Sequence, residues 1–439
     1  MIEWCNNGME KIDILGVQIN NQDKARILES LEKRLDAKKK TFLVTPYSEF
    51  IYRAFTDYDF RALLNSADFA LPDGVAIQWL AYFLNVPYSF KNFYARIFET
   101  YYQLCHSLAA IVFKPKKLKQ RIPERISGVD FFWDLVALAE KKRLSIFLLG
   151  GHGHTPELVL KKIHEKYPNV KIAGFSNKGP GNEDLVGDIN KSGADMLFVA
   201  YGPVKQENWI RSHLSELDIR LAVGLGGTFD YVSGKVFRAP HFLRNMGFEW
   251  LFRLVLQPHR AKRIWNGTVR LITGAFRYKV FMSMPYRQNV LSVILNKENL
   301  VFVARRGRDG EKIGNLHEEH WQFPQGGVDY KENLEKAVLR EVAEETNMTN
   351  LSILGHSKKR HSYIWNNTIR RVWFNRLKFK GQEQTIFFLK YFGDNSEIKL
   401  DLDELNEYKW IKPEDIKKTI HVVRSGMVDI VVEDINKYL

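Results

Sequence analysis

Four glutamates in the last third of the chain have the residue type and spacing of a metal site. Glu341, Glu344 and Glu345 stand at positions i, i+3 and i+4, and Glu332 precedes them. If residues 333–346 form an α-helix, the three later glutamates fall within an arc of about 100°. Like charges at this spacing repel one another, whereas Mg²⁺ prefers oxygen ligands. The segment is therefore either a magnesium site or a solvated charged face.

The residues around these glutamates narrow the choice. Gly326, Glu332 and the run from Arg340 to Glu345 have an order that resembles the Nudix box, and Arg340 can pair with an acid to hold the turn. MPYRQNVLSVILN, VFVARR, WQFPQGG and KGQEQTIFFL extend the resemblance over residues 284–439. They are similar to the Nudix hydrolases that remove pyrophosphate from RNA 5′ ends or cleave dinucleoside polyphosphates.

The Nudix resemblance implies an activity and a set of site residues. Mg²⁺ or Mn²⁺ would be bound by Glu341, Glu344, Glu345 and Glu332, and the substrate would be a nucleotide or an RNA 5′ end. Glu404 stands where that branch often has its catalytic carboxylate, with other acids close by. Attack of water on a phosphoanhydride needs a cation to neutralise negative charge and a group that accepts the water's proton.

Two further features of this region follow from the resemblance. Asn347 stands where the family usually has glycine, and because asparagine tolerates the left-handed conformation we expect the turn to be kept. His356, His361 and Arg370 are candidates to face phosphate, or else surface residues.

The first 280 residues contain other candidates, each a weak signal when taken alone. Thr45 lies in TPYSEF, Asp73 in LPDG, and Gln206 and Glu207 in YGPVKQENW. LLGGHGHT and GLGGTFD are glycine turns that follow apolar runs. Such turns let backbone N–H groups approach a phosphate, although many glycines after strands are plain turns.

Taken together, these stretches resemble the WecG/TagA/CpsF glycosyltransferases over residues 10–270. The match includes RISGVDFFWDL, AYGPVKQENWI, GLGGTFDYVSGKVFRAP and GFEWLFRLVLQPHRAKR. The resemblance implies a Rossmann-like α/β fold. It also implies transfer of an N-acetylmannosamine-type sugar, or its uronic acid, from UDP to a polyprenyl-diphosphate-linked N-acetylglucosamine, a step of cell-surface polysaccharide synthesis.

The same resemblance assigns roles to individual residues. Asp73 would be the general base on the acceptor hydroxyl, with Thr45 beside it. Donor contacts would come from Gln206, Glu207, Gly226 and Gly227. Arg238 and the cations beyond it would stabilise the leaving diphosphate, because arginine forks suit phosphate oxygens. No metal motif is evident in this half, and Tyr47 stands where the family often has asparagine.

The pattern of elements predicts how these residues are positioned. Apolar strands alternate with helices over residues 41–234, which indicates a parallel sheet covered on both faces. From residue 288 a strand hairpin, the glutamate helix and further strands predict an α+β (α/β/α sandwich) domain. We therefore expect a transferase domain at 1–240, a basic, aromatic-rich appendage at 241–284 and a Nudix domain at 285–439.

Two basic, aromatic-rich segments have open roles. Residues 82–121 are an insertion that either lies at a membrane interface through its basic end or packs as a helical hairpin. The appendage either binds RNA or meets the bilayer that holds a lipid-linked acceptor, and the second reading is favoured.

The composition of the chain limits its cellular location and the kinds of partner that it can bind. The 439 residues have a net charge of +14, which favours nucleic acid, anionic lipid or phosphorylated partners. Two cysteines are too few for a disulfide framework or a zinc site. With no secretory signal or membrane span evident, we expect a cytoplasmic protein, peripheral at the inner face of the cell membrane, and an oligomer is compatible with the sequence.

The sequence thus predicts a bifunctional enzyme, a UDP-sugar transferase joined to a Mg²⁺-dependent pyrophosphohydrolase. Two alternatives remain open. The Nudix domain could bind a nucleotide or RNA end as a sensor, without turnover. The whole chain could be an RNA-binding protein, which would leave LPDG and KQENW without a role.

Overall fold

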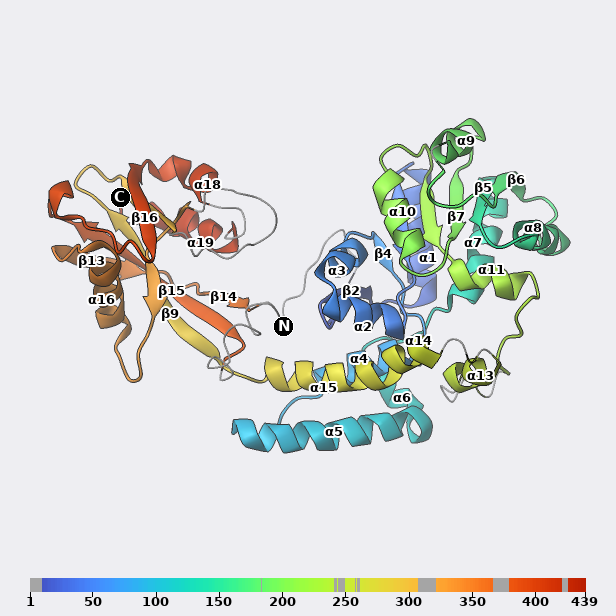
Figure 1. Ribbon diagram of the computed structural model, residues 1–439, viewed down its shortest axis with the longest axis horizontal. Coiled ribbons are helices and arrows are strands. Elements are labelled where there is room, and N and C mark those ends of the chain that lie inside the picture. The colour runs from blue at the N-terminus through green and yellow to red at the C-terminus, as the bar shows by residue number, and fades with distance from the viewer. Residues whose placement is uncertain are drawn as a thin grey trace. The chain divides into compact units, whose positions relative to one another are not determined.

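The computed structural model describes most of the chain and divides it into two compact units (Figure 1). The N-terminal unit is Met1–Val280 and the C-terminal unit is Phe281–Leu439. The described residues are 10–182, 184–240, 243, 249–256, 258, 261–306, 321–365, 379–420 and 425–439.

Six parallel strands form the main sheet of the N-terminal unit. Their spatial order is β4 (Phe69–Ala70), β3 (Thr41–Val44), β8 (Leu221–Gly224), β7 (Met196–Ala200), β5 (Ser145–Gly150) and β6 (Lys171–Ser176). Successive residues of a strand bury opposite faces, so that Phe42 packs into one core cluster and Leu43 into the other. Both faces are therefore covered, as apolar parallel strands require.

Helices supply the two layers around this sheet. One face packs against α1 (Lys24–Asp36), α7 (Gly128–Lys142), α8 (Thr155–Lys166) and α11 (Gly226–Val232). The other face packs against α2 (Ser48–Thr56), α3 (Tyr58–Asn65), α4 (Val75–Asn85), α9 (Leu185–Lys191) and α10 (Lys205–His213). The predicted Rossmann-like α/β class is confirmed.

A small antiparallel hairpin joins this second face. It consists of β1 (Lys11–Ile14) and β2 (Val17–Asn20), and it buries Ile14, Val17 and Ile19 in the core cluster of that face. Leu15 and Gly16 make the turn with positive φ angles of 54° and 89°.

The insertion and the appendage are both helical in their described parts. The insertion forms the end of α4, then α5 (Phe93–Phe113) and α6 (Pro115–Leu118). The appendage contains α13 (Glu249–Leu256), α14 (Ala261–Trp265), the π-helix η2 (Asn266–Arg270) and α15 (Leu271–Met282). Its residues 241, 242, 244–248, 257, 259 and 260 lie outside the described residues. Within the described ranges, no helix combines the length and apolarity needed to cross a bilayer.

Eight strands form the mixed sheet of the C-terminal unit. They are β9 (Tyr286–Leu295), β10 (Val301–Arg306), β11 (Trp321–Gln322), β12 (Gln325–Gly327), β13 (Leu351–His356), β14 (His361–Ile364), β15 (Gly381–Tyr391) and β16 (Leu405–Ile411). The long central pair β9–β15 is parallel, and the other pairs are antiparallel.

Helices lie on both faces of this second sheet. The helix α16 (Leu334–Thr346) packs on one face. The helices α18 (Ile416–Thr419) and α19 (Ser425–Ile435) pack on the other, and two short 3₁₀ turns, η4 (Asn395–Glu397) and η5 (Pro413–Asp415), complete the unit. The α+β sandwich predicted for this half is confirmed.

Candidate active sites

A cavity of about 260 Å³ opens at the carboxyl ends of the central strands of the N-terminal unit. Ligands of open α/β sheets bind at this edge, because loops that leave adjacent parallel strands form a crevice there. The lining comes from the loops after β3, β4, β7 and β8 and from the appendage. The lining residues include Thr45, Tyr47, Glu49, Asp73, Arg125, Ser127, Gly128, Gln206, Gly224, Gly226, Gly227, Thr228, Arg263 and Gly267.

Asp73 and Thr45 come together because they follow adjacent parallel strands. The Asp73 N–H donates to the Pro46 carbonyl at 3.1 Å, which ties the two loops to each other. A Cβ atom built on Gly128 would lie 3.8 Å from Asp73 Oδ2, 3.7 Å from Thr45 Oγ1 and 3.4 Å from Thr228 Oγ1. Three side-chain oxygens thus surround one point, which glycine leaves open.

Gln206 and Glu207 approach the same cavity from the start of α10, where both are buried. Gln206 Nε2 donates to Glu207 Oε1 at 2.7 Å, while Gln206 Oε1 has no hydrogen-bond partner among the described residues. Burial raises the pKa of Glu207 to about 7. Glu207 also accepts from the N–H of Val204 at 2.7 Å. Val204 has a φ of 71°, which is strained for a β-branched residue.

Glycines at the end of β8 and just after it leave room for these side chains. A Cβ on Gly224 would lie 2.6 Å from Gln206 Nε2 and from Glu207 Oε1, and one on Gly226 would lie 2.7 Å from Gln206 Oε1. Nothing lies within 4 Å of the corresponding position on Gly227, which faces open space. The glycine turn therefore leaves room for the Gln206 side chain, and it leaves the cavity open at Gly227.

Arg238 lies beside the cavity and does not line it. Its guanidinium donates to both Asp130 carboxylate oxygens, at 2.7 and 2.8 Å, and to Ser127 Oγ at 3.0 Å. Its nearest link to the cavity in these contacts is Ser127.

Arg263 of the appendage lines the cavity. It pairs with Glu49, donates to the Tyr47 hydroxyl and lies over the Tyr47 ring, with its Cζ 5.0 Å from the ring centroid. Burial raises the pKa of the Tyr47 hydroxyl well above its ordinary value. The appendage thus brings a cation to the side of the cavity where α2 begins.

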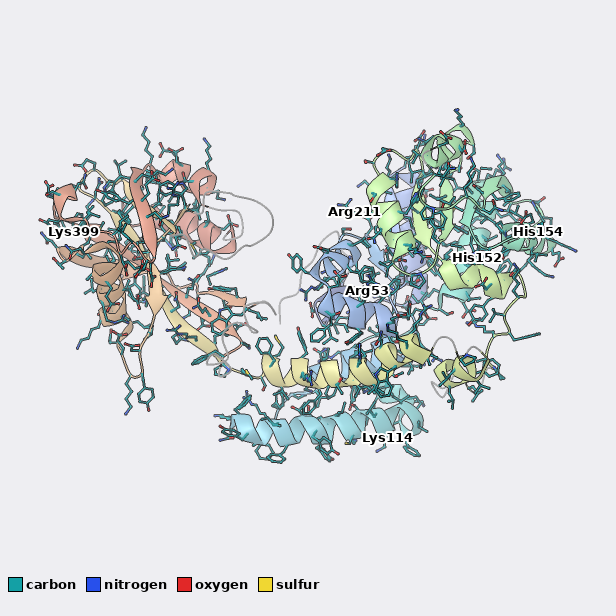
Figure 2. The ribbon with its side chains drawn as sticks, in the orientation of Figure 1. Arg53, Lys114, His152, His154, Arg211 and Lys399 are labelled. Atoms are coloured by element: carbon teal, nitrogen blue, oxygen red, sulfur yellow. The ribbon has the colours of Figure 1, made fainter. Side chains whose placement is uncertain are left out.

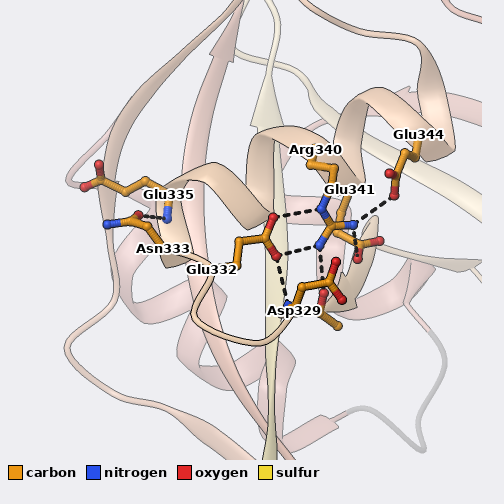
Figure 3. A network of polar contacts seen from close by, with 8 residues as sticks. Asp329, Glu332, Asn333, Glu335, Arg340, Glu341 and Glu344 are labelled. Carbon is orange, nitrogen blue, oxygen red and sulfur yellow. Dashed lines mark hydrogen bonds and ion pairs between the residues drawn. The ribbon is translucent and has the colours of Figure 1, made fainter.

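In the C-terminal unit, Arg340 holds three of the four predicted glutamates, Glu332, Glu341 and Glu344, around one guanidinium (Figure 3). It donates to both oxygens of Glu332 at 2.8 Å, and to Glu341 and Glu344 at 2.9 Å each. The Arg340 hydrogen bonds lower the pKa of Glu332 to about 2. A fourth contact reaches the Gly327 carbonyl at 3.0 Å, which fixes the helix against β12.

Glu345 lies toward the strand edge and Glu404. It is buried, and it accepts from the Gln325 N–H at 3.2 Å. Burial first, and then the negative charge of Glu404, raises the pKa of Glu345 to about 9. Burial likewise raises the pKa of Glu341, which also senses Glu404. The loop before β16 therefore places Glu404 beside the glutamate helix.

Two backbone features let this site form. A Cβ on Gly326 would lie 1.7 Å from Glu341 Oε2, so only glycine admits the carboxylate there. Asn347 ends α16 with φ 60°, in the left-handed conformation expected for it, and its Nδ2 donates to the Glu397 carbonyl at 3.0 Å.

The chemistry of these residues fits a hard divalent cation. In the described part of the chain, no three His, Cys, Asp or Glu side chains converge as a complete metal-ligand set. Arg340 draws Glu332, Glu341 and Glu344 together, while burial and the neighbouring Glu404 raise the pKa of Glu345. A cation bound beside Glu341 and Glu345 would offset the cost of ionising these two carboxyl groups.

Comparison with known proteins assigns the N-terminal unit. Residues 12–113 and 108–284 match the model of the glycosyl transferase WecG/TagA/CpsF family. The chain belongs to the WecG/TagA/CpsF family. The overlap of the two matched segments falls within the insertion, at the end of α5.

Relatives of this WecG/TagA/CpsF transferase carry the name N-acetylglucosaminyldiphosphoundecaprenol N-acetyl-beta-D-mannosaminyltransferase. The protein of Bacillus subtilis (strain 168) is 31% identical over 258 residues, which are 58% of this chain and 88% of that protein. The protein of Staphylococcus aureus (strain MRSA252) is 25% identical over 260 residues, again 58% and 88% of the two chains.

The C-terminal unit carries a NUDIX domain, matched over residues 285–429. Among solved structures, the MutT protein from Methanosarcina mazei Go1 is 24% identical, with a TM-score of 0.25, and covers 35% of this chain and 96% of its own. An Ap4A hydrolase complex from C. elegans is 18% identical, with a TM-score of 0.24, and covers 34% and 96%. The protein is thus an enzyme that joins a glycosyltransferase to a Nudix hydrolase.

The WecG/TagA/CpsF transferase brings most of the predicted site residues to one cavity. Asp73, Thr45, Gln206, Gly226 and Gly227 line it. Glu207 holds Gln206 by accepting its hydrogen bond. Arg238 lies beside the cavity, where it pairs with Asp130.

Sequence reasoning did not single out several residues that line this cavity, among them Arg125, Thr228 and Arg263. The first two lie within the quoted RISG and GLGGTFD stretches, so their place in those motifs was a signal. Arg263 was hidden among many cations of the appendage. In the C-terminal unit His356 and His361 lie on β13 and β14, and Arg370 lies outside the described residues.

Proposed function

We propose that the enzyme transfers an N-acetylmannosamine-type sugar, or its uronic acid, from UDP to a polyprenyl-diphosphate-linked N-acetylglucosamine. In the same proposal the Nudix domain hydrolyses a nucleoside-diphosphate-linked substrate. Transfer is assigned to residues 1–240 with the appendage 241–284, and hydrolysis to residues 285–439. The names of the Bacillus and Staphylococcus relatives support the transfer reaction. We place this reaction in cell-wall polysaccharide synthesis as part of the same proposal.

The observation that carries the transferase proposal is the convergence of Asp73, Thr45 and Gln206 on one cavity. The Asp73 carboxylate takes the proton of the acceptor hydroxyl as the new C–O bond forms and the C–O bond to UDP breaks. The unpartnered Gln206 Oε1 accepts a hydrogen bond from the donor sugar or nucleotide. Arg263 lines the cavity and would stabilise charge on the leaving diphosphate, and Arg238 would assist from beside the cavity.

For hydrolysis we propose Glu341, Glu344 and Glu345, with Glu332, as the residues that would hold Mg²⁺ or Mn²⁺. When bound, the cation would neutralise negative charge on the phosphoanhydride. Glu404, beside Glu345, accepts the proton of the attacking water. Arg340 keeps the glutamates oriented while the site is filled. The substrate class we propose is a nucleotide or an RNA 5′ end.

The proposed setting is the cytoplasmic face of the cell membrane, with peripheral attachment. A polyprenyl-diphosphate acceptor is confined to the bilayer, so the transferase must work at its surface. The basic net charge of +14 favours approach to anionic lipid.

Asp73→Asn tests the transferase assignment. Without a proton acceptor the rate of sugar transfer should fall by about 100-fold or more. Nudix hydrolysis should be unchanged in the same preparation. The measurement is release of UDP with a panel of UDP-sugars and a lipid-diphosphate-linked N-acetylglucosamine. The matched control is Asp59→Asn, an exposed acid of α3, which should leave both rates intact. Equal loss of both activities in Asp73→Asn would mean misfolding and would remove the assignment.

Glu345→Gln tests the hydrolase assignment. The amide keeps the volume and can still accept from Gln325 N–H, but it removes a charged ligand. Magnesium-dependent hydrolysis of nucleotide substrates should fall about 100-fold or more, while transfer is retained. The control is Glu335→Gln in the first turn of the same helix, where the side chain is exposed. Unchanged hydrolysis in Glu345→Gln would contradict the proposal, and no hydrolysis by the intact chain would favour a sensor.

A further inference from the structure

The long helix α5 of the insertion carries apolar side chains on both of its sides. Toward the N-terminal unit it buries Thr100, Gln103, Ser107 and Ala110, and the half-buried Leu104, Leu108 and Ile111 pack against the same core. Ser107 Oγ accepts a hydrogen bond from Trp79 Nε1 of α4 at 3.0 Å. An ordinary surface helix turns its apolar side inward, so the outer side of α5 needs an explanation.

The outer side of α5 is aromatic. Its exposed residues are Tyr94, Phe98, Tyr101, Tyr102, Val112 and Phe113, and four of the aromatic side chains are between 69% and 80% exposed. On a helical projection all six fall within an arc of about 120°. We call this set the α5 outer face. A contiguous exposed apolar surface of this kind marks an interaction site.

No charged residue interrupts the α5 outer face. The helix contains only two residues of the Asp, Glu, Lys and Arg types, and both turn back to the loop before it. Arg96 Nε donates to the Phe90 carbonyl at 2.8 Å. Glu99 accepts from the backbone N–H groups of Ser89 and Phe90 at 2.7 and 3.3 Å. The charges thus anchor the helix to its own unit and leave the outer face apolar.

A basic segment follows the helix directly. Lys114, Lys116, Lys119 and Arg121 are exposed and Lys117 is half-buried, while no Asp or Glu occurs from residue 100 to residue 123. Figure 2 labels Lys114 at the end of α5, where the apolar and basic parts meet. The surface therefore combines a row of aromatic side chains with a block of uncompensated cations.

We propose that the α5 outer face docks this enzyme on an anionic lipid bilayer, with the helix lying along the surface. Tyrosine and phenylalanine suit the boundary between headgroups and acyl chains. The adjacent lysines are attracted to anionic headgroups. The inference rests on the proposed function in one respect, since that function supplies the reason for an enzyme of this kind to sit at a membrane.

A second copy of the chain is the less suitable occupant of this surface. A two-fold contact places the same patch on both partners. It would offer the adjacent cations no acidic partner from the same segment, because no Asp or Glu occurs from residue 100 to residue 123. An anionic bilayer satisfies both the aromatic row and the cations.

The proposed docking helix is tied to the cavity through α4. This helix begins at Val75, two residues after Asp73, and packs against α5 along its length. With its 11 residues, α4 is about 16 Å long. Docking through α5 would therefore hold the proposed general base within a short distance of the headgroup region, where the diphosphate of a lipid-linked acceptor lies.

Vesicle sedimentation of the full-length chain tests the proposal without any acceptor present. The probes are vesicles of phosphatidylcholine alone and of phosphatidylcholine mixed with phosphatidylglycerol. The first variant is Phe98→Ser with Tyr102→Ser, and its control is Tyr58→Ser with Phe237→Ser, two exposed aromatic residues elsewhere in the unit. The second is Lys114→Gln, Lys116→Gln and Lys119→Gln. Its control changes the same charge at the exposed Lys161, Lys162 and Lys171.

The intact chain should sediment with the anionic vesicles. Each α5 variant should lower the partition coefficient about tenfold or more, while each control stays within about twofold. The lysine variant should also weaken the dependence of binding on salt. Equal binding by the variants and the intact chain would overturn the proposal. The proposal would also be overturned if the intact chain did not bind vesicles and formed a dimer that the α5 variants lose in sedimentation velocity. That result would assign α5 to a contact between copies of the chain.

A second readout separates this proposal from the proposed function. Transfer to a short-chain acceptor dispersed in water should proceed at the same rate in the α5 variants and in the intact chain. If the intact chain transfers no sugar but the vesicle results hold, the docking surface stands and the transferase assignment fails. If the intact chain transfers sugar but the variants still bind vesicles normally, the docking proposal is refuted and the transferase assignment stands.

Discussion

At the scale of single residues, the cavity of the N-terminal unit depends on one buried acid that holds another side chain in place. Glu207 accepts hydrogen bonds from Gln206 Nε2 and from the Val204 N–H. Gln206 Oε1 is thereby left without a hydrogen-bond partner among the described residues and faces the cavity. A buried carboxyl is costly when charged, and burial raises the pKa of Glu207 to about 7 from a usual 4.5. The site is thus built on a group that titrates near neutral pH.

The raised pKa of Glu207 predicts a pH-dependent stability. Below pH 4.5 the carboxyl is neutral in both the folded and the unfolded chain. As the pH rises from 4.5 to 7, the unfolded chain ionises first, so the free energy of unfolding falls by roughly 3 kcal/mol. Glu207→Gln should remove this part of the slope. Thermal unfolding at a series of pH values measures it, with the exposed Glu216→Gln as control; parallel slopes in Glu207→Gln and the intact chain would contradict the prediction.

At the scale of elements, the appendage completes the cavity through a π-helix. The η2 segment packs on α2, and a Cβ on Gly267 would lie 2.6 Å from Ser48 Oγ and 3.2 Å from Glu49 N. A π-helical turn is frequently found at functional sites. Here it brings the appendage close enough for Arg263, just before it, to reach Glu49.

Gly267→Ala should therefore lower the rate of transfer, by about tenfold, because the added methyl group pushes η2 and Arg263 away from α2. Ser48→Ala removes the nearer of the two obstacles. The double variant should recover part of the loss, while Ser48→Ala alone should have a small effect. Steady-state transfer rates of the three variants give the coupling. An additive or greater loss in the double variant would show that this contact does not position Arg263.

The elements also show what the sequence could and could not give. The parallel strands, the α16 helix and the sandwich of the C-terminal unit were predictable, because their apolar periodicity reflects burial. The helical spacing of residues 49–67 runs without a break in the sequence, yet the structure has two helices there, because Asp57 caps the second by accepting from the Phe60 N–H. The β1–β2 hairpin was missed because its turn, Leu15-Gly16, has leucine where asparagine, aspartate or glycine usually precedes the glycine.

The outer face of α5 and the place of Arg263 were beyond reach of the sequence for a different reason. The residues of α5 alternate at helical spacing, but only the packing of Ser107 on Trp79 shows which side faces the protein. Likewise, Arg263 is one of many appendage cations until η2 meets α2. Both depend on contacts between segments distant in the chain, which periodicity does not encode.

At the scale of the whole molecule, one chain joins a glycosyltransferase to a Nudix hydrolase, and the substrates proposed for both contain a diphosphate. The candidate residues of each lie within their own unit, Asp73 in Met1–Val280 and the α16 glutamates in Phe281–Leu439. Single substitutions can therefore silence one activity at a time. The fusion has a functional meaning only if the product or substrate of one unit affects the other.

One such link is that the Nudix domain removes a nucleotide that inhibits sugar transfer. Candidate nucleoside di- and triphosphates and dinucleoside polyphosphates are added to the transfer assay with Mg²⁺. An inhibitory nucleotide should slow the Glu345→Gln chain persistently, whereas the intact chain should recover its rate as the nucleotide is hydrolysed. Recovery should follow the measured hydrolysis rate, because removal of a competitor restores the donor's access. If no nucleotide changes transfer in either chain, the fusion reflects joint expression of two independent enzymes.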